Sequence, residues 1–352
     1  MVVALLAGGC GGDTRVAAPS RPIAPAGAGD TAVLEGIGST FVEPLVREWI
    51  RRYQALAPGV TINYEATGSI TALTRLKSGL RGTSGAGGDF FASDVPLTDV
   101  EAVTLGGSQA YVQVPWAAGA IAAVYNLPDV PDLRLSPDTL AAMFSGRITR
   151  WDDPAVRADN PGVRMPALAV SVVYRVDGSG TTSVFTSYLD AAGSGGWGLG
   201  RGDDVVFPRG TGVRGSEAVV AAVRRTAGAV GYVQLAHAHQ AGLPVARLGN
   251  RAGNFLAPTS DAVNATLAGA TLRSASTTAD LLFTPDAPGA YPLATVTYLL
   301  FRRDGLEPDK VTALRHFAAW AVGEGQRFAE PLGYARLPRQ FQGPALTELN
   351  EW

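Results

Sequence analysis

The chain has 352 residues, enough for two domains with cores of their own, and 46% of its residues are hydrophobic, as in an ordinary globular protein. Its formal net charge is −2 and no block of five or more basic residues occurs, so nucleic acid is not an expected partner. Cys10 is the only cysteine, which excludes a disulfide framework and a cysteine metal cluster.

The N-terminal segment places Cys10 directly after a short apolar run, residues 2–9, that ends in small residues. This pattern predicts a lipoprotein signal remnant over residues 1–10, in which Cys10 becomes the lipidated N-terminus. Residues 11–30 are rich in proline, alanine and glycine, so we expect a flexible tether. The protein would then be exported and lipid-anchored, in the periplasm or on the outer face of the cell membrane. The alternative is a chance cysteine in a disordered end.

From residue 31 onward, strand-like and helical apolar runs alternate, which predicts an α/β fold. The expected strands are residues 60–65, 90–93, 120–125, 168–175, 229–233 and 295–301. The expected helices are residues 44–56, 70–78, 137–144, 181–189, 216–225 and 308–322. Clusters of glycine and proline near 82–88, 191–202 and 208–215 indicate loops.

Three hydroxyl-bearing loops each lead into a predicted helix. Residues 36–41 read Gly-Ile-Gly-Ser-Thr-Phe, residues 67–71 read Thr-Gly-Ser-Ile-Thr, and residues 175–183 read Arg-Val-Asp-Gly-Ser-Gly-Thr-Thr-Ser. A helix N-terminus offers unpaired N–H groups and partial positive charge, which suit a small anion. One such loop is usually only a helix cap. Three of them, together with the planar charge of Arg175, favour a shared anion site.

Two apolar stretches, residues 111–125 and 291–301, are candidate crossings between two lobes. They would leave residues 31–112 plus 292–352 as lobe I and residues 113–291 as lobe II. The first two hydroxyl-bearing loops then belong to lobe I and the third to lobe II. We therefore expect a ligand held at the interface to close a cleft.

Motifs along the whole chain resemble those of one family. They are Gly38-Ser-Thr-Phe-Val-Glu-Pro44, Asp89-Phe-Phe-Ala-Ser-Asp-Val-Pro96, Phe144-Ser-Gly-Arg-Ile-Thr-Arg-Trp-Asp-Asp153, Arg175-Val-Asp-Gly-Ser-Gly-Thr-Thr182, Gly228-Ala-Val-Gly-Tyr-Val233 and Tyr291-Pro-Leu-Ala-Thr295. In order and spacing they resemble the periplasmic phosphate-binding proteins of high-affinity phosphate ABC importers, the PstS-like family. The resemblance implies a two-lobed periplasmic binding protein type II fold with two interdomain crossings. It also implies capture of inorganic phosphate by a monomer, without a cofactor, for the permease subunits of an ABC importer.

The resemblance also implies a set of ligand contacts. These fall on Thr40, Phe41 through its backbone amide, Ser69, Asp94, Arg175, Ser179, Gly180 and Thr181. Asp177 matches the family position that pairs with the site arginine. One departure follows Ser69, where the family is usually glycine-rich and this chain has Ile70 and Thr71.

Asp94 is the most diagnostic of these residues, because a carboxylate opposes an anion by Coulomb's law. It is expected only if the ligand carries a proton to donate. Phosphate near neutral pH carries one or two protons, and sulfate carries none, so Asp94 would reject sulfate. The alternative is an ordinary turn aspartate before Pro96.

Other functions remain open from the residues alone. The site could bind another tetrahedral oxyanion such as arsenate or sulfate, it could belong to a phosphoester hydrolase, or the protein could be a phosphate sensor. Ser179 lacks the first glycine of the Gly-x-Ser-x-Gly nucleophile motif, which argues against a hydrolase. His237 and His239 have strand-like spacing and could begin a metal site, but no third ligand is evident. We therefore expect a binding protein without a metal, and not an enzyme.

Overall fold

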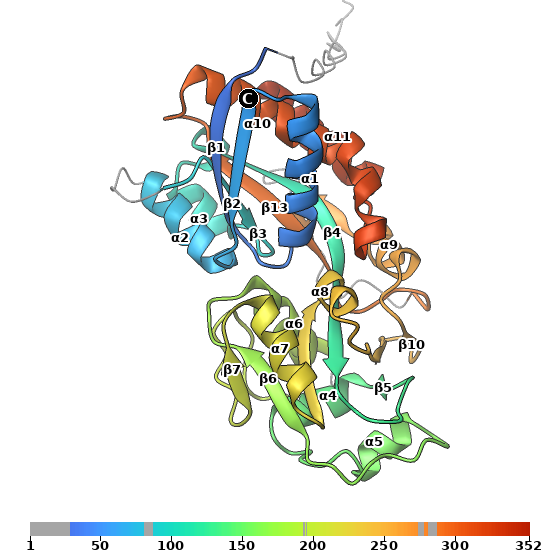
Figure 1. Ribbon diagram of the computed structural model, residues 1–352. Coiled ribbons are helices and arrows are strands. Elements are labelled where there is room, and N and C mark those ends of the chain that lie inside the picture. Colours follow the sequence, from blue (N-terminus) through green and yellow to red (C-terminus); the bar gives the residue numbers. More distant parts are fainter. Residues whose placement is uncertain (1–28, 81–86, 193, 195, 274–277, 281–286) are drawn as a thin grey trace, which may run out of the picture.

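The computed structural model describes residues 29–80, 87–192, 194, 196–273, 278–280 and 287–352 (Figure 1). The predicted lipidation site Cys10 and the tether up to residue 28 lie outside the described residues. Among the helices of the described ranges, none combines the length and apolar character that crossing a bilayer requires.

The main sheet has two parallel halves joined by an antiparallel pair. Its order is β2-β1-β3-β13-β4-β8-β6-β7, with β14 also paired to β4. These strands are β1 (Ala32–Gly38), β2 (Val60–Glu65), β3 (Phe90–Ser93), β4 (Tyr111–Tyr125), β6 (Ser171–Arg175), β7 (Thr211–Val213), β8 (Ala229–Gln234), β13 (Ala294–Arg302) and β14 (Tyr334–Ala335). Two small sheets contain β5 (Arg134–Leu135), β9 (Arg247–Gly249) and β10 (Phe255–Leu256), and β11 (Thr271–Arg273) with β12 (Thr278–Asp280).

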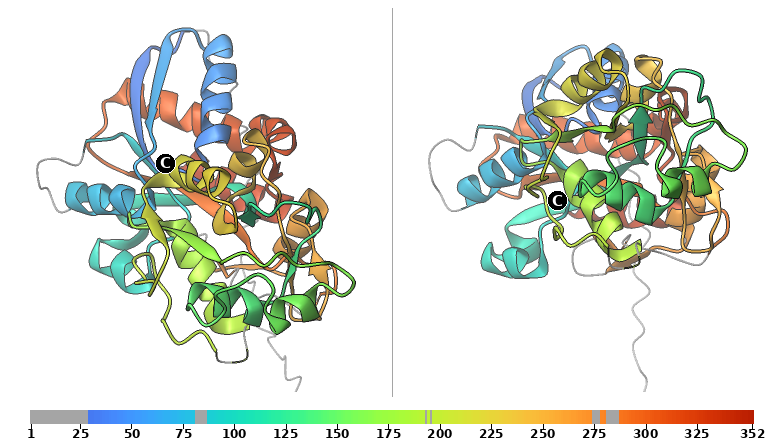
Figure 2. Two further views of the ribbon diagram at one scale, coloured as in Figure 1. Left: turned by 60° about the horizontal axis from the view of Figure 1, so that its bottom comes forward. Right: turned by 90° about the horizontal axis from the view of Figure 1, so that it is seen from below.

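Helices surround both halves of the sheet (Figure 1). They are α1 (Glu43–Leu56), α2 (Ser69–Leu80), α3 (Asp99–Thr104), α4 (Pro137–Phe144), α5 (Pro154–Asp159), α6 (Gly180–Ala192), α7 (Gly215–Arg225), α8 (Leu235–Gln240), α9 (Ser260–Ala268), α10 (Pro308–Val322) and α11 (Arg339–Glu351), with short 3-10 turns at Gly107–Gln109, Glu324–Phe328 and Glu330–Leu332. Seen from below, the green and yellow elements of the second half lie in front of the blue and red elements of the first (Figure 2).

Strand β4 connects the two halves. Its first part pairs with β13 and its last part, Ile121 to Tyr125, pairs with β8. The whole strand is buried, which explains its nearly continuous apolar sequence. The register of β4 and β13 shifts between Thr297 and Tyr298, where Pro115 lacks the N–H that a regular ladder needs. Such an irregularity turns side chains locally, and here it lies at the candidate site.

Each predicted strand and helix is present, but several bounds differ and further elements occur, among them β7 within the predicted loop at 208–215. The strand expected from residue 168 begins at Ser171, because the backbone of Leu168 and Val170 bonds to Trp151 and Thr149 in a neighbouring loop. Strand β1 was not predicted. Gly36 interrupts its apolar pattern, and a Cβ there would lie 2.1 Å from the ring of Phe90, so glycine is needed for β1 to pack beside β3.

Candidate anion-binding site

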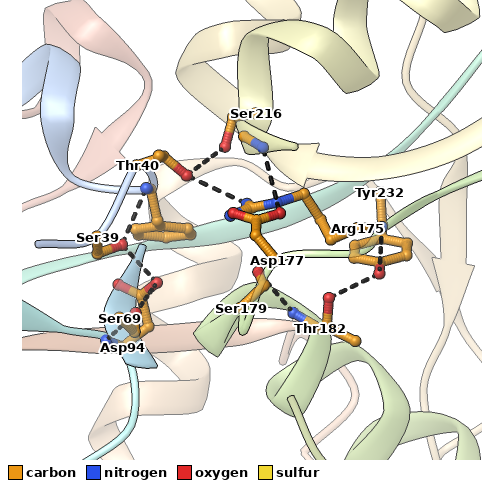
Figure 3. A network of polar contacts seen from close by, with 12 residues as sticks. Ser39, Thr40, Ser69, Asp94, Arg175, Asp177, Ser179, Thr182, Ser216 and Tyr232 are labelled. Carbon is orange, nitrogen blue, oxygen red and sulfur yellow. Dashed lines mark hydrogen bonds and ion pairs between the residues drawn. The ribbon is translucent and has the colours of Figure 1, made fainter. Parts of the chain in front are cut away.

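The predicted ligand residues lie on loops at the carboxyl ends of parallel strands. The loops after β1, β2 and β3 belong to the first half of the sheet, and the loops after β6 and β7 belong to the second. The two sets meet face to face (Figure 3). Ligand sites of α/β proteins commonly form at such strand ends. Several of these loops enter helices, so amide groups and helix dipoles add to the side chains.

Asp94 lies at the centre of the first set of loops and is only 4% exposed. Its Oδ2 accepts hydrogen bonds from Ser39 Oγ at 2.6 Å and from Ser69 Oγ at 3.2 Å, and its Oδ1 accepts one from Thr297 Oγ1 at 2.8 Å. Burial raises the pKa of Asp94 by more than these hydroxyl bonds and the charge of Arg175 lower it. Because Oδ1 has one lone pair left, the carboxylate can accept one further donor.

Arg175 ends β6 and is also buried, at 3% exposure. Its Nε donates to Asp177 Oδ1 at 2.6 Å and its Nη2 donates to Asp177 Oδ2, so the two side chains form a bidentate pair. Burial alone would raise the pKa of Asp177, but the hydrogen bonds and charge of Arg175 outweigh it and keep that pKa below its usual value. The amide of Gly215 also donates to Asp177. Asp177 therefore holds the guanidinium in a fixed plane, as the family resemblance implies.

Thr40 bridges the two sets of loops. Its Oγ1 accepts from Arg175 Nη1 at 3.1 Å and lies 2.9 Å from Ser216 Oγ, while its carbonyl accepts from His237 Nε2 at 2.8 Å. The amide of the next residue, Phe41, donates to Ser39 Oγ at 2.9 Å. One residue thus contacts three elements of the second half of the sheet.

The start of α6 supplies the other predicted residues. Ser179 Oγ accepts from the amide of Thr182 at 3.3 Å, which is the capping bond expected of it. Thr182 Oγ1 lies 2.7 Å from the hydroxyl of Tyr232 on β8. Gly180 lies against the first half: a Cβ there would be 2.6 Å from Ser69 Oγ. The close approach leaves no room for a side chain at this position in the present arrangement of the two halves.

The structure brings all the predicted ligand residues together in one buried region. Sequence reasoning overlooked three neighbours, which are Ser39, Ser216 and Thr297. Ser39 lies in a loop that was already singled out, and Ser216 follows Gly215 at a helix start, so the same Gly-Ser pattern marks it. Thr297 is a lone hydroxyl in an apolar strand, a signal too weak to use.

The interpretation of His237 and His239 as strand-spaced residues is wrong. Both lie on helix α8, where residues two apart point in different directions. His237 is buried and bonds to Thr40, whereas His239 is exposed. Across the described ranges, no group of three or more histidine, cysteine, aspartate or glutamate side chains is placed to hold a metal ion.

The arrangement combines a buried carboxylate, a fixed guanidinium, several hydroxyls and the N-terminus of α6. The guanidinium, hydroxyls and amides are donors to an oxyanion, and Asp94 is an acceptor. Such a set suits a tetrahedral oxyanion that carries its own proton. A cleft of about 390 Å³ borders the site and is lined from both halves, among others by Thr40, Arg47, Arg214 and Ser216.

Comparison with known proteins gives consistent results. The model of the PBP superfamily domain matches residues 8–324. The chain is 33% identical over 359 residues to phosphate-binding protein PstS3 of Mycobacterium bovis (strain BCG / Pasteur 1173P2), covering 99% of this chain and 95% of that protein. It is 33% identical over 344 residues to phosphate-binding protein PstS of Methanocaldococcus jannaschii, covering 91% of this chain and 86% of that protein.

Solved structures with low sequence identity share the fold. A phosphate-binding protein from Stenotrophomonas maltophilia superposes with a TM-score of 0.67 at 22% identity, covering 90% of this chain and 93% of that one. The high-affinity periplasmic phosphate-binding protein PfluDING, bound with phosphate, superposes with a TM-score of 0.65 at 20% identity, covering 89% and 92%. The predicted two-lobed periplasmic binding protein fold is thereby confirmed. The chain belongs to the PBP superfamily and, within it, to the PstS-like phosphate-binding proteins.

Proposed function

We propose that this protein captures inorganic phosphate outside the cytoplasm and delivers it to an ABC importer. The observation that carries the proposal is the buried Asp94 opposite Arg175, within a ring of hydroxyl donors. A proton-bearing phosphate can donate to Asp94 and accept from the other groups, so that each partner is satisfied. Sulfate would place two acceptors against each other.

The proposed phosphate ligands are drawn from both sides of the cleft. They are Thr40, the Phe41 amide, Ser69 and Asp94 on one side, and Arg175, Ser179, Gly180 and Thr181 on the other, with Asp177 holding Arg175 in place. We assign residues 31–112 plus 292–352 to lobe I and residues 113–291 to lobe II, with the hinge near residues 111–120 of β4 and near residues 291–295, where β13 begins. Phosphate would shift the equilibrium between the open and closed forms toward the closed form, and the size of this shift equals the difference in phosphate affinity between the two forms.

The proposal extends to location and partners. The protein would be a monomer, exported and held at the membrane by lipid on Cys10, with residues 11–30 as the tether. Closure would create a composite surface from both lobes that permease subunits could recognise. Support comes from the position of Cys10 in the sequence and from the names of the relatives.

Binding would need no metal or organic cofactor, and no enzymatic activity is proposed. A phosphoester hydrolase would need an activated nucleophile. Ser179 Oγ accepts a bond from the Thr182 amide, and the buried histidine His237 bonds to the Thr40 carbonyl, not to a hydroxyl. A sensory role would use the same binding step.

The proposal is tested by isothermal titration of the purified protein with phosphate, arsenate and sulfate at two pH values. We expect tight binding of phosphate and much weaker binding of sulfate. Equal affinity for phosphate and sulfate would contradict the role given to Asp94, and no binding of phosphate would contradict the function itself.

A further inference from the structure

Three successive carbonyl groups in the loop after β1 each accept a hydrogen bond from a buried side chain. The Ser39 carbonyl accepts from Tyr64 Oη at 2.9 Å, the Thr40 carbonyl from His237 Nε2 at 2.8 Å, and the Phe41 carbonyl from Tyr334 Oη at 2.5 Å. The donors come from three separate elements, which are β2, α8 and β14. Only the loop's position in the folded chain brings them together.

These bonds determine which way the loop amides point. In a planar trans peptide, the carbonyl and the following N–H point in opposite directions. The bond between His237 and the Thr40 carbonyl therefore turns the Phe41 amide away from α8. That amide donates to Ser39 Oγ, which in turn donates to Asp94. The Phe41 amide is thus turned toward the side of the loop where the proposed phosphate ligands lie.

His237 differs from the two tyrosines in its place in the molecule. Tyr64 and Tyr334 belong to the lobe proposed for residues 31–112 plus 292–352, as does Thr40 itself, whereas His237 belongs to the opposite lobe. Its bond to Thr40 therefore crosses the cleft, beside the bond that Arg175 donates to the Thr40 hydroxyl and the bond between the Thr40 and Ser216 hydroxyls. When the lobes separate, the Thr40 carbonyl must exchange this bond for water.

We propose that His237 is a positioning residue for phosphate binding, which latches the two lobes together through the Thr40 carbonyl and aligns the Phe41 amide with the ligand. This inference rests on the proposed function. His237 is outside the expected ligand set, and its proposed role is to stabilise the closed form without contacting phosphate.

The chemistry of the imidazole makes this latch sensitive to pH. A carbonyl can only accept, so Nε2 carries the proton in the neutral ring. Burial, and to a smaller extent the charge of Arg175 on β6, lower the pKa of His237. The Thr40 carbonyl, Glu43 of α1 and Glu217 of α7 act in the opposite direction, but the pKa remains below its usual value. An imidazole exposed by opening would return toward its usual value of about 6.5. The latch is therefore complete above that pH, and closure becomes less favourable as the pH falls below it.

The test compares His237→Leu, His237→Gln and the matched control His239→Gln, which changes an exposed histidine two residues along the same helix. Phosphate affinity and the phosphate dissociation rate are measured for each at about pH 7.5 and about pH 5.5, on either side of the usual histidine pKa. Thermal unfolding without phosphate reports on folding. Comparing each variant with the wild type at the same pH removes the effect of phosphate's own titration.

We expect His237→Leu to weaken binding roughly 5- to 150-fold, since it leaves a buried carbonyl without a donor. Most of the change should appear as faster dissociation. Glutamine can donate from a similar position, so His237→Gln should bind phosphate nearly as well as wild type at the higher pH. Since glutamine does not titrate, the ratio of its phosphate affinity to that of wild type should rise at the lower pH. His239→Gln should match wild type throughout.

Two results would overturn the latch: a folded His237→Leu protein with wild-type affinity, or a His237→Gln protein whose affinity relative to wild type is the same at both pH values. The glutamine comparison decides the matter if the leucine variant does not fold. A wild-type protein that does not bind phosphate would overturn both the latch and the proposed function, whereas the first two results would overturn the latch alone.

Discussion

Gly180 offers a sharp test of closure, because its substitution by alanine would place a wedge between the lobes. Gly180 begins α6, and its backbone has no left-handed torsion that would exclude alanine. A Cβ there would lie 2.6 Å from Ser69 Oγ and 2.9 Å from Asp94 Cβ, both on the opposite side of the cleft. The Ser69 hydroxyl can rotate away, but the Asp94 Cβ cannot.

The size of the effect follows from these distances. Ordinary contact begins at 3.4 Å, so the lobes must move apart by about 0.5 Å to clear the Asp94 Cβ at 2.9 Å, even after the Ser69 hydroxyl has rotated away. The bonds of Thr40 to Arg175, Ser216 and His237 are 3.1, 2.9 and 2.8 Å long, and such a shift would stretch them beyond the usual hydrogen-bond lengths. At about 0.5–1.5 kcal/mol each, their loss costs roughly 1.5–4.5 kcal/mol, or about 10- to 1,000-fold in affinity.

The assay is isothermal titration of Gly180→Ala with phosphate, together with thermal unfolding of the protein without phosphate. We expect weaker binding with little change in stability, because Gly180 is the first residue of α6, where the advantage of alanine over glycine inside a helix does not apply in full. Gly289→Ala is the control, since Gly289 lies in an exposed turn with nothing within 4 Å of an added Cβ. Wild-type affinity in a folded Gly180→Ala protein would refute the close approach of the lobes at this point.

Four further outcomes are expected. Asp94→Asn should reduce the preference for phosphate over sulfate, because the asparagine amide can donate a hydrogen bond to sulfate. In the wild type this preference can reach about 10⁴-fold, and titration of both proteins with both anions measures the change. In the wild type the same preference should decline as the pH falls through the raised pKa of Asp94, since a protonated carboxyl no longer requires a proton from the ligand; a preference that is flat down to acid pH would contradict this. Arg175→Ala should cost about 2–5 kcal/mol of binding, and Asp177→Ala less, with both proteins still folded by circular dichroism. Mass spectrometry of the native protein should find lipid on Cys10, and an unmodified N-terminus well past it would refute the anchor.

Local sequence determined the elements that carry the site. Helix starts at Ser69 and Gly180 could be predicted because glycine, serine and threonine act on the backbone within a few residues of themselves. Apolar periodicity placed six strands and six helices for the same reason, and among the longer elements it missed β1, α9 and α11. The family motifs added Asp94 and Arg175, and membership of that family is confirmed.

The tertiary structure decided which side chains complete the site. Thr297 meets Asp94 across 203 residues of sequence, Ser216 meets Thr40 across 176, and His237 meets the Thr40 carbonyl across 197. The sequence around Thr297 and His237 does not mark them, and the Gly-Ser pattern at Ser216 does not reveal its partner, because these contacts depend on the strand order and on the irregular pairing of β4 with β13. Because α8 is a helix, the side chains of His237 and His239 point in different directions, and their spacing of two residues in the sequence does not reveal this. Contacts of this kind arise only when distant loops are brought to the same end of one sheet.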